Sequence, residues 1–554
     1  MKKTGFFFLQ MLLLCSAVFG QNDTVNMRAP LDIPLLLSGN FGELRTNHFH
    51  AGIDFKTQGT VGKPIFSPAD GYVARVKVSP GGYGRALYIM HDNGYMTVYA
   101  HLNAYTADIA NRIHSFQYEN ETFAADISFA PEEFRVKRGE LVAYSGNTGY
   151  SFGPHVHFEV RKSDGNELVN PLRFYKHLIA DSRPPVAYAY AVTPYKGAGV
   201  VNSGSNTVTC KFAGDTLNVW GVVGVSVKAE DFMDNTTNRY GIYRYEMYVD
   251  DSLRFSSVMD GFSFDETRLI NAWADYQRRS SDGDWYLRSY VLDNNPLRAL
   301  SCDENRGWIT IDEERIYNVK YRLYDYHGNV KSCSFALRGK CDTIPSVYDE
   351  EGHLLLWYIN NEISYQGMHL AIPAGELFED TYIKVFELPA TDISRSYDIA
   401  GSAIPLRNGA FLRMQINDSL PYPERCYYLR RKNGKGWLSA GGKASNGWVE
   451  GKISVLGIYD VAVDTVAPQV KALNEKRWRG SGTIIFTLRD TQTGIKDYKG
   501  YIDDKFILFE FSSKTGRLTC NHKREGVSPG KHRLRLVVTD YAGNETIIEK
   551  TIIL

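Results

Sequence analysis

Five residues that could form a hydrolytic metal centre lie in three short segments of the chain. The segment HAGID at residues 50–54 carries an imidazole and a carboxylate, and HVH at residues 155–157 carries two further imidazoles. Between them, the segment YAHL at residues 99–102 adds a fourth. Imidazole and carboxylate groups bind zinc, and an imidazole that is not a ligand can accept or relay a proton from an activated water. We therefore interpret the chain first as a metallopeptidase.

Local spacing indicates that these side chains can share one pocket. His155 and His157 are two residues apart, so in a strand they point to the same face. The β-branched Val156 and the apolar residues that follow favour a strand here. His50 and Asp54 are aligned at a spacing of four, and Gly52 between them disfavours a helix.

Three of the polar residues can supply the ligands of a catalytic zinc site, which uses three protein groups and a water. These are His50, Asp54 and His157. His48 is an alternative ligand on the same face as His50, and we interpret it as a solvated or supporting group. His101 and His155 would then remain beside the metal as proton acceptors or as donors to an oxyanion.

The elements that must position these residues are predicted to be strands. From about residue 30 to 180, short alternating runs such as residues 71–76 and 86–90 are separated by Gly and Pro. Residues 105–135 interrupt this pattern with polar and aromatic residues. We expect an insertion at the rim of the sheet, helical around residues 107–114. The first module is assigned to residues 21–180, including this insertion.

A pair of similar segments indicates an internal repeat after the first module. Residues 181–185 (DSRPP) and 464–468 (DTVAP) are each followed by an aspartate, a Gly-Ile pair and a final Asp-Tyr-x-Gly-Asn phrase. Their alternating strands predict immunoglobulin-like β-sandwiches at residues 181–345, with an insertion near 255–310, and at 464–554. The aspartate of the final phrase suits a hairpin turn, with calcium binding as the alternative.

Residues 346–463 lack these markers and are predicted to form a further β-rich module. Together with the 554-residue length, this gives four modules, which we call the first, second, third and C-terminal modules. The predicted fold class is mainly all-β, and the 13% aromatic content suits it.

The charge balance gives no support for nucleic-acid binding. Basic and acidic residues each number 63, whereas a nucleic-acid binder normally has a basic excess. No segment after the N-terminus is apolar enough to cross a membrane.

The N-terminal residues 1–20 are predicted to be a signal peptide. Lys2 and Lys3 precede an apolar run at residues 6–14, and small residues follow up to Gly20. Two alternatives are a buried N-terminal helix and a lipid anchor at Cys15, which Leu14 disfavours. Export would place the protein in the periplasm or cell envelope, or outside the cell.

Six cysteines remain after the signal peptide, and they are sparse with no metal-binding spacing. Cys333 and Cys341 could pair locally, or both could be free thiols. The chain is not a disulfide scaffold.

The three motifs together resemble those of the lysostaphin-like, LytM-type zinc endopeptidases, peptidase family M23. The resemblance covers about residues 38–173, and residues 146–161 match the last family motif almost throughout. It implies an antiparallel β-sheet groove with one zinc per chain and the peptide part of peptidoglycan as substrate. It also implies ligands at His50, Asp54 and His157, with catalytic histidines at His101 and His155.

We therefore expect an exported zinc metalloendopeptidase that hydrolyses peptide bonds in peptidoglycan. Some relatives lack ligands and act as non-catalytic activators of other wall hydrolases, which is one alternative. An adhesin or glycan-binding protein with a vestigial peptidase is the other, since the modules after residue 180, which resemble bacterial immunoglobulin-like domains, could bind a protein or glycan partner.

Overall fold

The computed structural model describes residues 25–346, 352–401, 403–417 and 422–554. The predicted signal peptide at residues 1–20 lies outside the described residues. Strands in mainly antiparallel sheets dominate the described chain, which confirms the predicted all-β fold class.

The first module is built on one large sheet and one small sheet. The central strand β13 is buried on both faces, and its neighbours β4 and β8 are largely buried as well. The large sheet has the order β1 (Leu37–Gly39), β4 (Ile53–Lys56), β13 (His155–Lys162), β8 (Tyr95–Ala100), β7 (Arg85–His91), β6 (Gly71–Val78) and β10 (Ala125–Ser128), with β11 (Arg135–Val136) and β14 (Glu167–Val169) at its margins. The small sheet has the order β5 (Pro64–Phe66), β12 (Leu141–Tyr144) and β9 (Ala104–Tyr105), and β2 (Leu44–Arg45) pairs with β3 (His48–Phe49) as a hairpin.

The predicted insertion at residues 105–135 forms a helix and an added strand. Helix α1 (Ala107–Glu119) buries Ile109, Ile113 and Gln117, which recur every four residues along one face. Strand β10 then pairs with β6 and extends the large sheet. The helix therefore continues beyond the residues expected to be helical, because its buried face continues to the last turn.

The second module is one ten-stranded sheet carrying a small helical segment. Its main order is β16 (Val208–Cys210), β15 (Val186–Val201), β17 (Leu217–Glu230), β25 (Val330–Gly339), β24 (Ile316–Tyr324), β18 (Arg244–Val249), β19 (Ser252–Val258) and β22 (Leu300–Cys302), with β21 (Leu287–Arg288) and β23 (Ile309–Ile311) beside β17. The segment between β19 and β22 holds β20 (Gly261–Ser263), η2 (Phe264–Leu269), α3 (Ile270–Trp273) and α4 (Tyr276–Ser281). Strand β20 leaves this module and pairs with β14 of the first module.

Each of the last two modules buries its core between two sheets. In the third module, one sheet has the order β27 (Asn361–Tyr365), β28 (Met368–Ile372), β32 (Pro405–Gln415), β36 (Trp448–Val455) and β35 (Lys443–Ser445). The other has the order β30 (Val385–Leu388), β31 (Ser396–Ile399), β37 (Gly457–Val463), β33 (Tyr427–Asn433) and β34 (Gly436–Gly441). In the C-terminal module, one sheet has the order β38 (Gln469–Ala472), β39 (Ile484–Arg489), β43 (Arg517–Cys520) and β42 (Glu510–Ser512). The other has the order β41 (Lys505–Ile507), β40 (Ile495–Ile502), β44 (Lys531–Asp540) and β45 (Glu545–Ile553).

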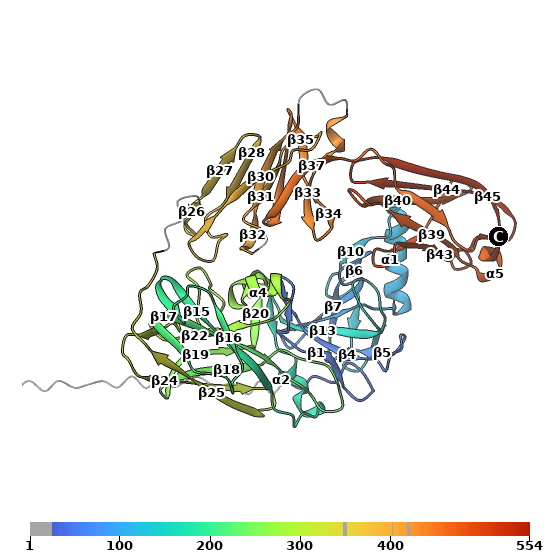
Figure 1. Cartoon of the computed structure of the whole chain (residues 1–554). Coiled ribbons are helices and arrows are strands. Elements are labelled where there is room, and N and C mark those ends of the chain that lie inside the picture. The colour runs from blue at the N-terminus through green and yellow to red at the C-terminus, as the bar shows by residue number, and fades with distance from the viewer. Residues whose placement is uncertain (1–24, 347–351, 402, 418–421) are drawn as a thin grey trace, which may run out of the picture.

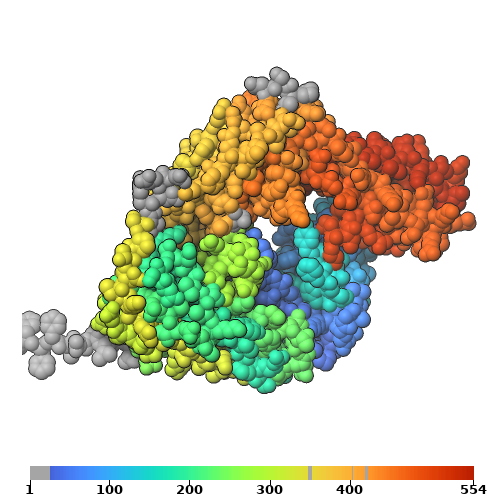
Figure 2. Space-filling model, in the orientation of Figure 1, coloured from blue at the N-terminus to red at the C-terminus, as the bar shows by residue number. Residues whose placement is uncertain are grey.

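The four modules form a closed ring (Figure 1), and the C-terminal module returns to α1 of the first. The space-filling view shows an opening at the centre of the ring, bordered by the first, third and C-terminal modules (Figure 2). Ring closure brings residues more than 350 positions apart in the sequence into contact beside the first module.

No helix among the described residues is both long enough and apolar enough to span a membrane. The six cysteines from Cys210 to Cys520 are all free thiols, so Cys333 and Cys341 do not pair.

Candidate metal centre

Two neighbouring strands set the position of the aspartate and one histidine. Asp54 on β4 is the direct cross-strand partner of His157 on β13, so their side chains leave the sheet on one face. His50 reaches the same place from the turn before β4. This turn requires glycine at position 52, because a Cβ there would lie 2.2 Å from the carbonyl oxygen of Phe158.

Three donor atoms from these residues converge on one point. His50 Nε2 lies 2.9 Å from His157 Nδ1, and Asp54 Oδ1 lies 3.1 Å from the first and 2.9 Å from the second. All three residues are buried. Ligands of a tetrahedral zinc ion are about 3.3 Å apart, given metal–ligand distances near 2.0 Å. The spacing therefore fits a single small cation.

The other ring nitrogen of each histidine faces a hydrogen-bond acceptor. His50 Nδ1 donates to the carbonyl oxygen of Asn40 at 2.7 Å, and His157 Nε2 donates to Glu159 Oε1 at 2.8 Å. These bonds select the tautomers that turn both remaining lone pairs toward Asp54. Two lone pairs and a carboxylate this close repel one another unless a cation or proton lies between them, so the donor set fits a metal ion.

The proton affinities of the three residues agree with this arrangement. Burial disfavours the cationic form of His157, but hydrogen bonds to Asp54 and Glu159 outweigh it and raise its pKa to about 9. Burial lowers the pKa of His50. Burial also opposes ionisation of Asp54, yet the neighbouring histidines hold its pKa well below the usual value. A metal binding here therefore competes with a proton.

Glu159 supports the centre and was not identified from the sequence. Its carboxylate is fully buried and accepts hydrogen bonds from the hydroxyl of Tyr83 and, at 2.7 Å, from Arg161 Nε. Burial alone would raise its pKa, but Arg161 and His157 lower it to about 2. The alternation of β13 offered a signal, since Glu159 and Arg161 continue the face that carries His157. No sequence signal pointed to Tyr83.

Asp54 has a second partner on the wall of the site. Arg45 Nη2, from the β2–β3 hairpin, donates to Asp54 Oδ2 at 3.0 Å and leaves Oδ1 directed at the two imidazoles. This contact was also not predicted, because nothing in the spacing of residues 45 and 54 distinguishes it from a surface charge.

The two remaining histidines of the motifs lie beside the three donors. His101 follows β8 in the left-handed region, at φ +61°, a conformation that is strained for a side chain of this kind. Its ring centroid lies 4.8 Å from that of His155, whose Nε2 is 3.6 Å from Asp54 Oδ1. The structure thus brings together all five predicted residues, while the division into ligands and catalytic groups stays a prediction.

Both of these rings are also fixed through Nδ1. His101 Nδ1 donates to the carbonyl oxygen of Thr148 and His155 Nδ1 to that of Gly153, each at 2.8 Å. Burial, with His157 and His155 nearby, lowers the pKa of His101 to about 3. His101 is therefore neutral at physiological pH, and its free Nε2 can accept a proton.

The other histidines of the first module lie outside this group. His48 is exposed, with Nδ1 bonded to the carbonyl oxygen of Thr46, and is not among the converging donors. His91 is buried against the hydroxyl of Thr97. His114 on α1 contacts the C-terminal module.

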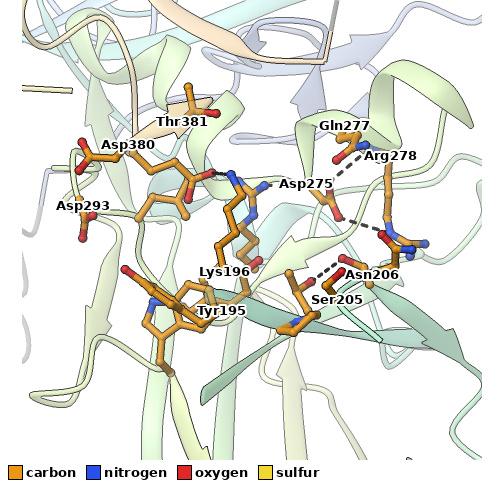
Figure 3. A pocket seen from close by; sticks show the side chains of 18 of the residues that line it. Tyr195, Lys196, Ser205, Asn206, Asp275, Gln277, Arg278, Asp293, Asp380 and Thr381 are labelled. Carbon is orange, nitrogen blue, oxygen red and sulfur yellow. Dashed lines mark hydrogen bonds and ion pairs between the residues drawn. The ribbon is translucent and has the colours of Figure 1, made fainter. Parts of the chain in front are cut away.

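A cavity of about 690 Å³ lies away from the histidines, where the second and third modules meet (Figure 3). Its wall mixes aromatic and charged side chains, among them Tyr195, Arg278 and Asp275. Asp275 is close to Arg278 Nε, at 3.3 Å, and to Arg288, so these charges largely compensate one another. The cavity contains none of the residues that the motifs predict.

Two family models match parts of the chain. Peptidase family M23 matches residues 48–117 and 123–171, which include all five residues of the centre. The Zu5-like domain matches residues 352–464, in the third module.

Curated proteins are similar to this chain over the first module. An uncharacterized metalloprotease of Haemophilus influenzae is 37% identical over 124 residues, which are 22% of this chain and 20% of the relative. The DD-carboxypeptidase/endopeptidase Mpg of Neisseria meningitidis is 36% identical over 130 residues, 23% of each chain. The chain thus spans only about a fifth of the length of these two relatives.

A third relative is matched over most of its length. Lipoprotein NlpD of Yersinia enterocolitica is 32% identical over 116 residues, which are 21% of this chain and 93% of the relative. Through residues 48–171, where the histidine and aspartate motifs lie, the chain belongs to peptidase family M23.

Proposed function

We propose that the protein is a zinc-dependent endopeptidase that hydrolyses peptide bonds of peptidoglycan. One observation carries this proposal: His50, Asp54 and His157 turn three acceptor atoms toward one point, 2.9–3.1 Å apart, with two further histidines beside them. The name of a relative in Vibrio cholerae, the peptidoglycan DD-endopeptidase ShyA, which is 29% identical over 139 residues, supports the substrate class.

The three donors would hold the zinc, and His101 and His155 would handle protons. A zinc ion bound there supplies Lewis-acid polarisation of the scissile carbonyl and makes a water more acidic. The Nδ1 of His101 is bonded to the carbonyl oxygen of Thr148, so its free Nε2 can take a proton from the attacking water. The free Nε2 of His155, once protonated, can donate to the developing oxyanion or to the departing amine. The buried Glu159–Arg161 pair keeps His157 in the tautomer whose Nδ1 lone pair faces Asp54.

The site of action follows from the substrate and the N-terminal residues. A peptidoglycan hydrolase must be exported, and the lysines and apolar run of residues 1–20 are typical of a signal peptide. We place the enzyme in the periplasm or cell envelope, with the later modules available for a protein or glycan partner.

A non-catalytic role is the second candidate, since some members of the family lack ligands and activate other hydrolases. Here the complete donor set argues for catalysis. An intact site also argues against an adhesin with a vestigial peptidase.

Digestion of purified sacculi by zinc-loaded residues 21–554 tests the proposal. We expect soluble muropeptides whose masses identify the cleaved bond, and release that falls by ~10²-fold or more in His101→Ala. The exposed His177→Ala variant is the matched control and should act as the wild type does. Equal release by the wild type and His101→Ala would refute catalysis by this site.

A further inference from the structure

Three carboxylates converge at the junction of the first and second modules, away from the histidines. Asp181 lies in the linker that leaves the first module, Asp231 follows β17, and Asp325 follows β24. Each offers an oxygen within 4.8 Å of the others. The sequence repeat predicted that these positions correspond between the second and C-terminal modules, and it left calcium binding as the less favoured alternative for one of them.

Two of these carboxylates are incompletely satisfied. Asp325 accepts hydrogen bonds from the backbone of Gly328 and Asn329 and from the Asn329 amide, at 2.6–2.8 Å. By contrast, Asp231 Oδ1 and Asp181 Oδ2 are buried and accept no hydrogen bond from any residue that the structure describes. Asp231 is only 2% exposed, and the Asp181 side chain is fully buried.

In the corresponding cluster of the C-terminal module, the carboxylate oxygens do not lack hydrogen-bond donors in this way. Asp464, Asp490 and Asp540 also converge within 4.8 Å, but none of their oxygens is among the buried, unpaired atoms of the described residues. Thr493 donates its hydroxyl to Asp464 at 2.6 Å, and Gly494 N donates to Asp490 at 2.6 Å. Gly494 follows Asp490 by four residues, whereas Gly241 follows Asp231 by ten. Because the loop after Asp231 is longer, the cluster of the second module lacks hydrogen-bond donors equivalent to Thr493 and Gly494.

The nearby cationic groups compensate the charge only in part. His327 Nδ1 is 3.7 Å from Asp181 Oδ2, beyond hydrogen-bond distance, and its Nε2 is bonded to the carbonyl oxygen of Ile179. Arg183 directs its guanidinium at the carbonyl oxygens of Met233 and Thr236. Burial of a carboxylate without a full counter-charge is unfavourable.

We propose that Asp181, Asp231 and Asp325 bind one calcium ion. An all-oxygen donor set selects a hard cation, and oxygens about 2.4 Å from Ca²⁺ lie at most about 4.8 Å apart, as observed here. The ion would connect the linker residue Asp181 to two strand ends of the second module, and so fix the first module against the second. This inference does not depend on peptidase activity.

Calcium titration of the desalted, zinc-loaded full-length protein tests the site. By calorimetry we expect one Ca²⁺ per chain with Kd of about 10⁻⁵–10⁻³ M, together with a rise in Tm. Asp231→Asn should weaken binding at least tenfold, and its Tm without calcium should equal or exceed that of the wild type. Asp490→Asn, the matched change in the other cluster, should leave calcium binding intact.

Several results would overturn the assignment. It would fail if the wild type bound no calcium saturably up to about 10 mM, or if Asp231→Asn bound it as tightly as the wild type does. A loss of calcium affinity in Asp490→Asn equal to that in Asp231→Asn would also overturn it. Zinc content is measured before and after the titration, because calcium binding accompanied by equimolar zinc release would place the ion at the histidines instead. A Tm response to Mg²⁺ equal to the response to Ca²⁺ would contradict the choice of cation.

Discussion

The two walls beside the metal centre are held by different modules and by different forces. The second module supports the wall formed by residues 40–49. The C-terminal module contacts the opposite wall, formed by residues 79–85 and 147–153. The first contact is a continued β-sheet with an apolar core, and the second combines charged and polar contacts with a ring contact between Tyr118 and Phe506.

The wall at residues 40–49 is part of a continuous core. Strand β20 pairs with β14, so the large sheet of the first module continues into the second. Phe262 on β20 lies 5.0 Å from Phe41 and 5.3 Å from Phe49 between ring centroids, and Phe49 also packs on Trp273. The stabilisation that comes from burying these apolar side chains is large and insensitive to salt.

The opposite wall is contacted mainly by polar groups. Lys514 donates to the carbonyl oxygen of Ser151 at 2.6 Å, and Arg85 pairs with Glu510 at 2.7 Å. Helix α1 adds contacts from His114 and Tyr118 to Glu525, at 2.8 and 2.7 Å. The exposed contact of Lys514 with Asn147 contributes little and weakens with salt, whereas the Glu525 carboxylate is fully buried.

This difference in contacts indicates that the wall at residues 40–49 is fixed and that the wall at residues 79–85 and 147–153 is adjustable. The fixed wall carries Asn40 and leads directly into His50, which a metal site must hold rigidly. The adjustable wall carries Ser151 and Gly153, which contact His155 and not the three donors. Movement of residues 147–153 would thus affect His155 and substrate access first, whereas Tyr83 links the same wall to His157 through Glu159.

The largest expected effect comes from the fixed wall. Phe262→Ala should destabilise the protein by about 3–5 kcal/mol, because Phe262 is fully buried, and should lower zinc occupancy through the displaced Phe49–His50 segment. Chemical denaturation and metal analysis measure both. Phe386→Ala, at an exposed position of the third module, is the control. Unchanged zinc occupancy in a destabilised Phe262→Ala protein would show that this wall does not position His50.

A smaller effect is expected at the adjustable wall. Glu525→Gln weakens the acceptor for His114 and Tyr118, and we expect a loss of about 1–3 kcal/mol in unfolding free energy with full zinc occupancy. Glu549→Gln, on the exposed face of the same module, should be neutral. Loss of zinc in Glu525→Gln would mean that both walls hold the metal site.

Lys514→Ala should change unfolding free energy by less than about 1 kcal/mol, since its contacts are partly solvated. It should nevertheless alter the ratio of activity on small peptides to activity on intact sacculi, because Lys514 contacts the loop beside His155. Lys531→Ala, on the same module away from the wall, is the control. An unchanged ratio would remove the argument for control of access by this module.

The smallest effect is expected from acid. Burial raises the pKa of Glu510, but Arg85 and Arg524 lower it further, so it falls below the unfolded value near 4.3. The pair therefore stabilises docking above about pH 4.3, and this contribution is lost as the pH falls through the folded pKa. Hydrogen exchange of residues 510–525 should increase in that range before exchange of β20 does. Simultaneous exchange of both segments would contradict separate walls.

The sequence predicted those parts of the structure that depend on local pattern. Strand alternation places His155 and His157 on one face, and the all-β fold follows from similar runs. It did not predict that β20 joins the first module's sheet or that Lys514 reaches Ser151, 363 positions away. Such contacts depend on how modules pack, and a lysine at a docking surface has no distinguishing local pattern.

The most direct test of the peptidase account compares zinc content and turnover in the wild type, His155→Ala and His157→Ala. We predict about one zinc per chain in the wild type and in His155→Ala, with turnover on peptidoglycan peptide reduced by ~10²-fold or more in His155→Ala. His157→Ala should lose both zinc and turnover. Zinc retained by His157→Ala but lost by His155→Ala, or zinc-loaded wild type without turnover, would contradict the account.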